Sequence, residues 1–307
     1  MSRTERTCTT HTIPVMEFFQ KSARNNAMAD DTLNSAATSD ADSKSAYARY
    51  AEQEDIDPRC IPIKLDGPVP EHDAITYPDY PPHDHETWRA LYERQAQQLP
   101  GRACDEYLEG MRILDLRPDR LPSLRDISLT LDAMVGWRVA RIPGLLDTND
   151  FFSFMARAHF PSTDYIRQPE ELEYTPAPDC FHDIFGHMPT LTNPFFSKFF
   201  QFFAQTFLNV SEPREIRMLE RFYWFTVEFG LINTGQGRRI YGAGILSSPK
   251  EVLHSLSDQV EVLPFDPARL GSQEYDVWHL QPILFAIESF EQLDSEFRDW
   301  ARFMKWN

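Results

Sequence analysis

The stretch PDCFHDIFGHMP, residues 178–189, carries two histidines, His182 and His187, five positions apart. Five residues along an ideal α-helix turn through about 500°, so the two rings would point about 140° apart. The H-E-x-x-H spacing, which places two metal ligands on one helical face, is absent. If both rings bind one metal ion, the helix must distort or end between them, and Gly186 and Pro189 permit such a backbone. The alternative is that both histidines are ordinary surface or core residues.

A second stretch, FYWFTVEFGLI at 222–232, places one carboxylate, Glu228, among apolar and weakly polar residues. A buried ionised carboxylate without a partner is so costly that it is normally protonated, paired or bound to a metal. No Lys or Arg lies four positions to either side of Glu228. The sequence leaves open that Glu228 points to water at the edge of an aromatic helix. If it is buried, two histidines and one glutamate form a set that is typical of non-haem Fe(II) sites that handle oxygen.

The composition is that of a globular protein, with 42% hydrophobic and 13% aromatic residues in a chain of 307. Its 30 basic and 47 acidic residues give a net charge of −17, which argues against nucleic acid or an anionic membrane as a partner. No run approaches the roughly 18 apolar residues of a transmembrane helix. The cysteines lack C-x-x-C spacing, which favours free thiols in a reducing cytoplasm. They are Cys8, Cys60, Cys104 and Cys180.

Three regions are expected along the chain. Residues 1–50 lack hydrophobic clusters and are predicted to be a disordered tail, in which Met28 offers a second possible start. Residues 51–84 are rich in proline and are predicted to form an extended arm. Residues 85–307 are predicted to form one catalytic domain.

Hydrophobic periodicity and capping residues predict a mostly helical domain. Ser289 and Gln292 form a capping box before the last helix, whose apolar stripe ends near Met304. Helices are expected at 85–98, 103–114, 124–135, 151–160, 195–207, 213–232 and 290–304. The helix at 124–135 is expected to be capped by Ser123 and ended by Gly136, and Asn193 is expected to open the helix at 195–207. Short strands are expected at 239–246, 260–263 and 283–287, where the glycines of the first indicate a close approach of the backbone to something bound.

Taken together, these stretches resemble the pterin-dependent aromatic amino acid hydroxylases, and the bacterial members most closely, over residues 77–297. Asp183 stands where animal members carry glutamate and bacterial members aspartate. The resemblance implies a single, mainly α, basket-like catalytic domain with a few short β-strands. It is carried by DYIR (164–167), YTPAPD (174–179), HDIFGHMP (182–189), YWFTVEFGL (223–231) and YGAGILSS (241–248).

The resemblance implies that His182, His187 and Glu228 bind Fe(II). The implied reaction uses a tetrahydropterin and O2 to add one oxygen atom to an aromatic ring, and the protein's part is to bury the site and leave coordination positions open. A zinc hydrolase could use the same three ligands, with Asp183 as its general base. A non-catalytic binding protein that kept the fold is a third reading. Iron content and pterin-dependent O2 uptake separate these alternatives.

The resemblance also implies a site for the amino-acid substrate. Arg167 would hold the substrate carboxylate and be oriented by Asp179, with Thr175 and Ser247 assisting. The alternative for Arg167 is a structural ion pair with Asp179, and both roles can hold because a bidentate arginine needs a fixed plane.

A further set of residues matches the pterin site of the family. Phe151 would stack on the pterin ring, although a plain core residue is the alternative at that position. The full set implied by the resemblance is Gly144, Leu146, Thr148, Phe151, Asp183 and Tyr223.

Two positions bear on which aromatic amino acid is used. Trp224 stands where tryptophan hydroxylases carry the smaller Phe, so it leaves room for a six-membered ring and crowds an indole. Val277 aligns where tyrosine hydroxylases carry Asp, and it offers no partner to a phenol hydroxyl, whose desolvation would cost roughly 1–3 kcal/mol. These positions favour L-phenylalanine as substrate and L-tyrosine as product, as in phenylalanine catabolism. A tyrosine or tryptophan hydroxylase, with both side chains serving only as core, is the alternative.

The oligomeric state is expected to be a monomer. Residues 1–76 hold no room for the regulatory domain of animal members, and no heptad helix follows the last predicted helix. Activation by substrate is therefore not expected.

Overall fold

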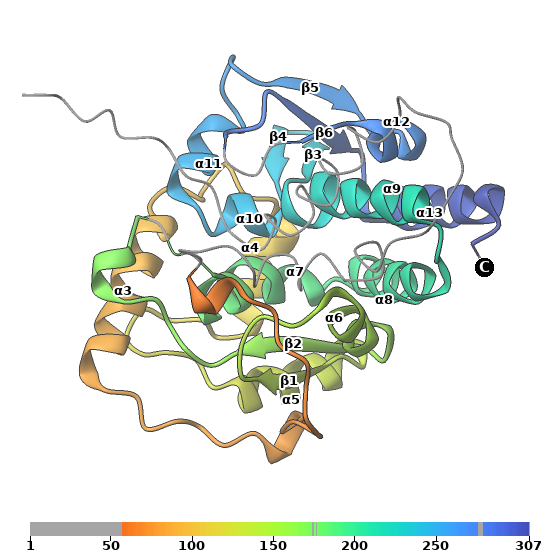
Figure 1. Ribbon diagram of the computed structural model, residues 1–307. Helices are drawn as coiled ribbons and strands as arrows, with labels where there is room; N and C mark the ends of the chain where they lie inside the picture. Colours follow the sequence, from red (N-terminus) through yellow and green to blue (C-terminus); the bar gives the residue numbers. More distant parts are fainter. Residues whose placement is uncertain (1–56, 174, 176, 276–278, 307) are drawn as a thin grey trace, which may run out of the picture.

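The computed structural model describes residues 57–306 except 174, 176 and 276–278 (Figure 1). The predicted tail at 1–50 and Val277 lie outside the described residues. The main helices are α3 (Pro82–Ala96), α4 (Asp105–Ile113), α5 (Leu124–Val135), α6 (Thr148–Ala156), α8 (Pro194–Asn209), α9 (Pro213–Tyr223) and α13 (Phe290–Met304). Shorter ones are α7 (Met188–Leu191), α10 (Ala243–Leu246), α11 (Pro249–His254) and α12 (Pro267–Ser272). The strands are β1 (Arg138–Ile142), β2 (His159–Thr163), β3 (Leu231–Thr234), β4 (Gly237–Ile240), β5 (Glu261–Pro264) and β6 (Ile283–Ile287).

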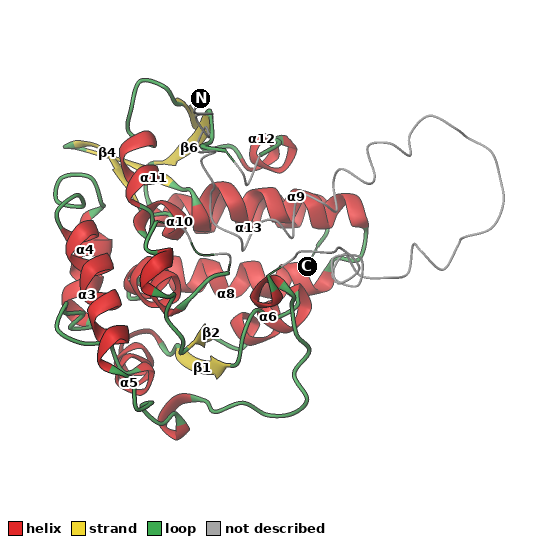
Figure 2. Ribbon diagram, turned by 60° about the vertical axis from the view of Figure 1, so that its left-hand side comes forward, coloured by secondary structure: helices red, strands yellow, loops and turns green. Residues whose placement is uncertain are grey.

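Two small sheets lie at opposite ends of the molecule, with helices between them (Figures 1 and 2). Strands β1 and β2 form a parallel pair. The other sheet has the order β4-β3-β6-β5, in which β3 and β4 are antiparallel and the other two pairings are parallel. The prediction of a mainly helical domain with a few short strands is confirmed.

Aromatic side chains fill the core between α8, α9 and α13. The ring of Phe222 on α9 lies 4.8 Å from that of Phe297 on α13, and Phe203 on α8 lies 5.2 Å from Phe297. These rings are almost fully buried. Burial of such large apolar surfaces is the main stabilising term for this part of the fold, and it fixes the helices that carry the functional residues.

Capping residues set several helix ends as predicted. The Ser123 hydroxyl accepts a hydrogen bond from Asp126 N at the start of α5, and Gly136 ends this helix in the left-handed region with φ 72°. The Asn193 side chain caps α8. The Ser289 hydroxyl accepts from Gln292 N at the start of α13, whereas the Gln292 side chain accepts from Glu288 N instead of closing the box on Ser289. The predicted strands near 260–263 and 283–287 are confirmed as β5 and β6.

Three predicted elements were wrong in extent. The helix expected at 151–160 ends at Ala156, because His159 and Phe160 pair with β1 as part of β2. The helix expected at 213–232 becomes π-helical at Trp224 and ends at Glu228, after which β3 pairs with β4 and β6. The strand expected at 239–246 stops at Ile240, and its second half is α10.

None of the described helices combines the length and apolar character needed to cross a membrane.

Candidate metal centre and the pocket around it

His182 and His187 mark the two ends of a π-helical segment, His182–His187. In a π-helix the backbone hydrogen bonds join residues five apart, so residues five apart lie close to one another on the same face. The two Nε2 atoms are 3.1 Å apart and both side chains are buried. The helix is therefore distorted between the two histidines, which is one of the two ways in which their five-residue spacing could serve a single site. Neither histidine is a surface residue.

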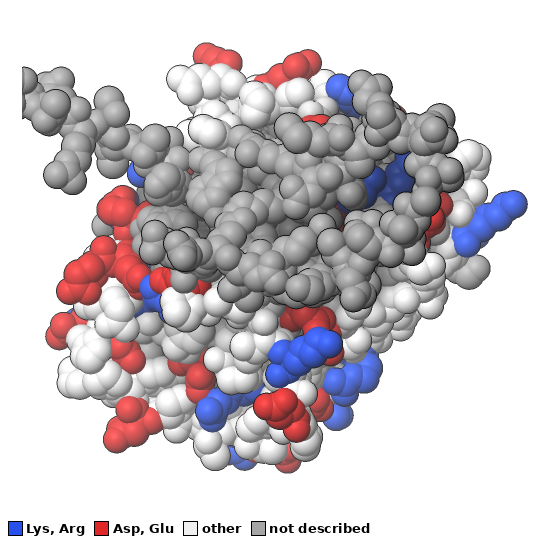
Figure 3. Space-filling model, viewed as in Figure 1, with Lys and Arg blue, Asp and Glu red and all other residues white. Residues whose placement is uncertain are grey.

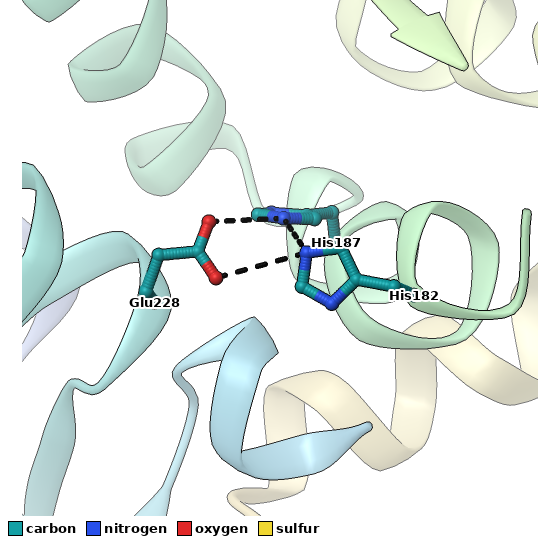
Figure 4. Close-up of side chains that lie close together, drawn as sticks. All are labelled: His182, His187 and Glu228. Atoms are coloured by element: carbon teal, nitrogen blue, oxygen red, sulfur yellow. Dashed lines mark hydrogen bonds and ion pairs between the residues drawn. The ribbon is translucent and has the colours of Figure 1, made fainter. Parts of the chain in front are cut away.

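Glu228 ends the second π-helical segment, Trp224–Glu228, in which Phe229 N donates to Trp224 O at 2.8 Å. Its carboxylate faces both histidines, with Oε1 3.2 Å from His187 Nε2 and Oε2 3.7 Å from His182 Nε2 (Figure 4). The side chain is only 2% exposed, so the alternative in which Glu228 points to water is wrong. The ligand atoms of the three residues lie within 4.8 Å of one another.

The spacing of these atoms suits a single metal ion. Two nitrogens bound at about 2.1 Å and at right angles to one another around an ion would be about 3.0 Å apart, close to the separation of the two Nε2 atoms. Two imidazoles and one carboxylate leave coordination positions open, which is the donor set of non-haem Fe(II) oxygenases. We refer to His182, His187 and Glu228 as the triad.

Glycines let the chain pack tightly against the end of the Glu228 segment. A Cβ at Gly242 would lie 2.4 Å from Gly230 N and 2.5 Å from Glu228 O, which no side chain could tolerate. The close approach expected from the YGAGIL sequence is thus an approach to the backbone of the Glu228 segment. It brings α10, and Ser247 just after it, beneath the triad.

Electrostatics keep the triad in a metal-binding state. Burial alone would raise the pKa of Glu228, but His187 and His182 outweigh it and lower this pKa to about 2. Burial lowers the pKa of His182 to about 4. At neutral pH a carboxylate therefore faces a neutral His182 imidazole, and both groups have lone pairs to offer to a cation.

A hydrogen-bond chain fixes the tautomer of His182. The Ser247 hydroxyl donates to Ala243 O at 2.8 Å, so it accepts from the Nδ1–H of His182 at 2.9 Å. With its proton on Nδ1, His182 directs the Nε2 lone pair toward His187 and Glu228, where a metal ion would bind. The sequence grouped Ser247 with the substrate residues, and the structure places it behind a triad histidine.

A pocket of about 720 Å³, counted out to its open mouth, reaches the triad; we call it the central pocket. All six residues of the predicted pterin set line it together with the triad. They are Gly144, Leu146, Thr148, Phe151, Asp183 and Tyr223.

Asp183 is the polar group on one wall of the central pocket. Its Oδ2 accepts hydrogen bonds from Thr163 N at 2.9 Å and Thr163 Oγ1 at 3.1 Å. Burial raises its pKa to about 7. Sequence reasoning missed Thr163, because its contact runs partly through the backbone and depends on the pairing of β2 with β1. It also missed Phe160, whose ring lies 5.2 Å from that of His187.

Arg167 and Asp179 form a buried bidentate ion pair. The Arg167 Nε and Nη2 atoms each donate to one Asp179 oxygen at 2.8 Å, and Arg167 N donates to Oδ2 at 2.9 Å. Burial would raise the pKa of Asp179, but Arg167 lowers it further than burial raises it. The structural ion pair that the sequence offered as an alternative is present. Arg167 Nη1 makes no hydrogen bond to a described residue, and the plane of the guanidinium is fixed.

Thr175 and Trp224, the other predicted substrate residues that the structure describes, are not among the residues that line the central pocket. The Thr175 hydroxyl donates to Ala177 O at 2.9 Å. Trp224 is fully buried between the rings of Phe229 and Tyr275, with centroids 4.3 and 4.4 Å away. Asp179 connects Arg167 to the triad, because its Oδ1 accepts from Arg167 Nη2 and also from His182 N at 3.2 Å.

The family model and the relatives that match this chain agree on one family. Residues 30–307 match the family described as biopterin-dependent aromatic amino acid hydroxylase. The phenylalanine-4-hydroxylase of Pseudomonas aeruginosa is 45% identical over 214 residues, which are 70% of this chain and 81% of that protein. That of Chromobacterium violaceum is 42% identical over 238 residues, 75% of this chain and 80% of that protein.

Solved structures agree with these relatives. The C. violaceum phenylalanine hydroxylase with bound iron(III) and 7,8-dihydrobiopterin superposes with a TM-score of 0.70 at 41% identity, covering 74% of this chain and 83% of that one. The phenylalanine hydroxylase of Legionella pneumophila has a TM-score of 0.69 at 40% identity, covering 74% of this chain and 92% of that one. The chain therefore belongs to the biopterin-dependent aromatic amino acid hydroxylases.

Proposed function

We propose that this protein is a phenylalanine 4-monooxygenase, which uses Fe(II), a tetrahydropterin and O2 to convert L-phenylalanine to L-tyrosine. The observation that carries the proposal is the convergence of His182, His187 and Glu228 on a pocket lined by the whole predicted pterin set. Four relatives that bear the name phenylalanine-4-hydroxylase, at 40–45% identity, support the choice of substrate.

In this proposal the triad holds the iron, which supplies O2 activation when bound. Ser247 sets the tautomer that makes His182 a ligand, and the burial of all three side chains limits their contact with water. The predicted pterin set beside the triad favours a hydroxylase over a zinc hydrolase, and the relatives named phenylalanine-4-hydroxylase favour an enzyme over a binding protein.

The pterin would occupy the central pocket. Phe151 offers a flat apolar wall and Asp183 a polar group, which suits a ring system with apolar faces and a polar edge. Tyr223 and the loop from Gly144 to Thr148 complete the walls.

The amino acid would bind through its carboxylate to Arg167, whose plane Asp179 holds. The C. violaceum enzyme, with a TM-score of 0.67 at 40% identity, has been solved with iron and phenylalanine bound. Trp224 and Val277 would shape the space for the ring, and Thr175 and Ser247 would assist binding.

We further propose a monomeric cytoplasmic enzyme of phenylalanine catabolism without nucleic-acid or membrane partners. Among the described residues, Cys104 and Cys180 are free thiols, as in a reducing compartment. On the face in Figure 3, the described basic side chains are interspersed with acidic ones. The large apolar side chains that are exposed are spread over several elements: Ile63, Tyr77, Leu129, Met134, Phe195, Leu208, Leu253 and Phe303.

Product analysis tests the proposal. The purified protein is supplied with phenylalanine, tyrosine or tryptophan, with and without Fe(II) and tetrahydropterin, and O2 uptake is recorded. Tyrosine formation from phenylalanine that needs both additions supports the proposal. Turnover that needs zinc and no O2, or a higher kcat/KM for tyrosine or tryptophan, contradicts it. Light scattering tests the monomer against the chain mass of 35.7 kDa.

A further inference from the structure

The segment from Asp57 to Pro70 is part of the proline-rich region predicted at 51–84, and we use the name arm for this segment alone. It runs along the outside of the molecule past β2 (orange in Figure 1). We propose that the arm positions both sides of the active site, with Arg59 holding the amino-acid side and Ile63 and Leu65 holding the pterin side. The identity of the two ligands rests on the proposed function. The contacts of the arm with the rest of the protein do not depend on the proposed function.

Arg59 clamps the loop that follows Arg167. Its Nη1 donates to Glu171 Oε2 at 2.9 Å, and its Nη2 donates to Glu171 Oε1 at 2.6 Å, which is a bidentate pair. On its other edge the same guanidinium is held by Asp57, through Nε at 3.1 Å and Nη2 at 2.8 Å. The group is therefore fixed between two carboxylates, and Glu171 cannot move without breaking this arrangement.

Glu171 in turn holds the backbone next to Arg167. It ends a short 3-10 turn, Pro169–Glu171, and its Oε2 also accepts from Gln168 N at 3.0 Å. Gln168 directly follows Arg167, the proposed carboxylate-binding residue. Arg94 of α3 holds the same loop further along, at Glu173, through a more exposed pair. Arg59 thus acts on the chain immediately beside the substrate site, and we describe it as a positioning residue.

Four residues later the arm contacts the rim of the central pocket. Ile63 N donates to Leu145 O at 2.8 Å, and Ile63 forms a parallel bridge with Leu146. Leu65 and Val69 pack against a separate hydrophobic cluster that contains Leu146, and Phe151 packs against the same cluster. Leu146 and Phe151 both line the central pocket. The arm therefore supports the pterin wall from outside.

Loss of the Arg59 contact and loss of the Leu65 contact should each change a different KM value. A partly exposed ion pair contributes up to about 1 kcal/mol, so its loss should change binding by about twofold to fivefold. Arg59→Gln should raise the KM for phenylalanine by this factor, with kcat and the KM for pterin unchanged. Leu65→Ala should raise the KM for pterin and leave the KM for phenylalanine unchanged. Arg59→Lys keeps the positive charge but cannot form the bidentate pair with Glu171. Its KM for phenylalanine should therefore lie between those of wild type and Arg59→Gln.

The experiment uses the full chain with iron and tetrahydropterin and measures both KM values, kcat and the thermal midpoint. Arg112→Gln is the matched control, because it removes a bidentate pair with Glu109 on the exposed side of α4 and should leave both KM values unchanged. Hydrogen exchange of residues 168–173 should be faster in Arg59→Gln than in wild type and unchanged in Leu65→Ala. Unchanged KM values, or the same rise of both KM values in both variants, would overturn the proposal.

Failure of the proposed function is distinguishable from failure of this inference. If the wild-type protein makes no tyrosine, the proposed function fails, and the exchange measurement still tests the clamp because it needs no turnover. Exchange at 168–173 that Arg59→Gln does not accelerate would overturn the clamp whether or not the enzyme is active.

Discussion

The Ser247 hydroxyl accepts a hydrogen bond from the Nδ1–H of His182 at 2.9 Å and donates a hydrogen bond to Ala243 O at 2.8 Å. One small side chain therefore decides which nitrogen of His182 carries the proton. Because the metal-facing nitrogen is the other one, the state of the triad depends on a residue that does not belong to it.

Ser247→Ala should weaken iron binding by about 10-fold to 100-fold, because His182 loses the partner that fixes its tautomer and ring plane. Iron affinity measured by titration of the apo protein checks this. Ser255→Ala is the control, since it also removes a buried hydroxyl, one that donates to Val252 O away from the triad. Equal iron affinity in wild type and Ser247→Ala would contradict the role of the hydrogen bond.

Glu251 should make the protein more stable at acidic than at alkaline pH. Burial raises its pKa to about 8, and its Oε1 has no hydrogen-bond partner among the described residues. A raised carboxyl pKa means that the folded state binds a proton more tightly than the unfolded state does. The stabilising contribution is thus present at low pH and is lost as the pH rises from about 4.5 towards 8.

Glu251→Gln should remove this dependence by replacing the carboxyl with a neutral amide. We expect a gain in the free energy of unfolding of about 1–3 kcal/mol at pH 8 and less than about 1 kcal/mol at pH 5. Denaturant unfolding at the two pH values measures it. The exposed substitution Glu93→Gln is the control, and an equal effect of Glu251→Gln at both pH values would show that burial of the carboxyl is not the cause.

Trp224→Phe should raise the kcat/KM for tryptophan relative to phenylalanine, because the smaller ring leaves more room beside the Glu228 segment. The same change removes part of a three-ring stack with Phe229 and Tyr275, so the free energy of unfolding should fall by about 1–3 kcal/mol. Competition assays with the two amino acids measure the ratio. A ratio that stays constant while stability falls would leave Trp224 a core residue only.

Local signals in the sequence predicted much of the fold. Ser123 and Gly136 marked both ends of α5, and Asn193 marked the start of α8, because capping depends on a few neighbouring residues. The spacing of His182 and His187 indicated that a helix serving one metal ion must distort or end between them, but it could not show that the segment is a π-helix. The second π-helical segment, ending at Glu228, had no sequence signal of its own. The chain that packs against its end, at Gly242, comes from a later part of the sequence.

Contacts between distant parts of the chain could not be predicted. Arg59 and Glu171 are 112 residues apart, and His182 and Ser247 are 65 apart. Neither pair has a spacing that marks it, and each exists only because the fold brings two elements together. The resemblance to a family supplied the residue sets for pterin and substrate, which the spacing of the residues alone would not have given.

The central claim is that His182, His187 and Glu228 together bind the iron that hydroxylates phenylalanine. Its most direct test is to measure bound iron and tyrosine formation in the same preparations of wild type and Glu228→Ala. We predict about one iron per chain and pterin-dependent tyrosine formation in wild type, and loss of both in Glu228→Ala with an unchanged helical circular-dichroism signal. One iron per chain retained by Glu228→Ala would contradict the assignment of the triad.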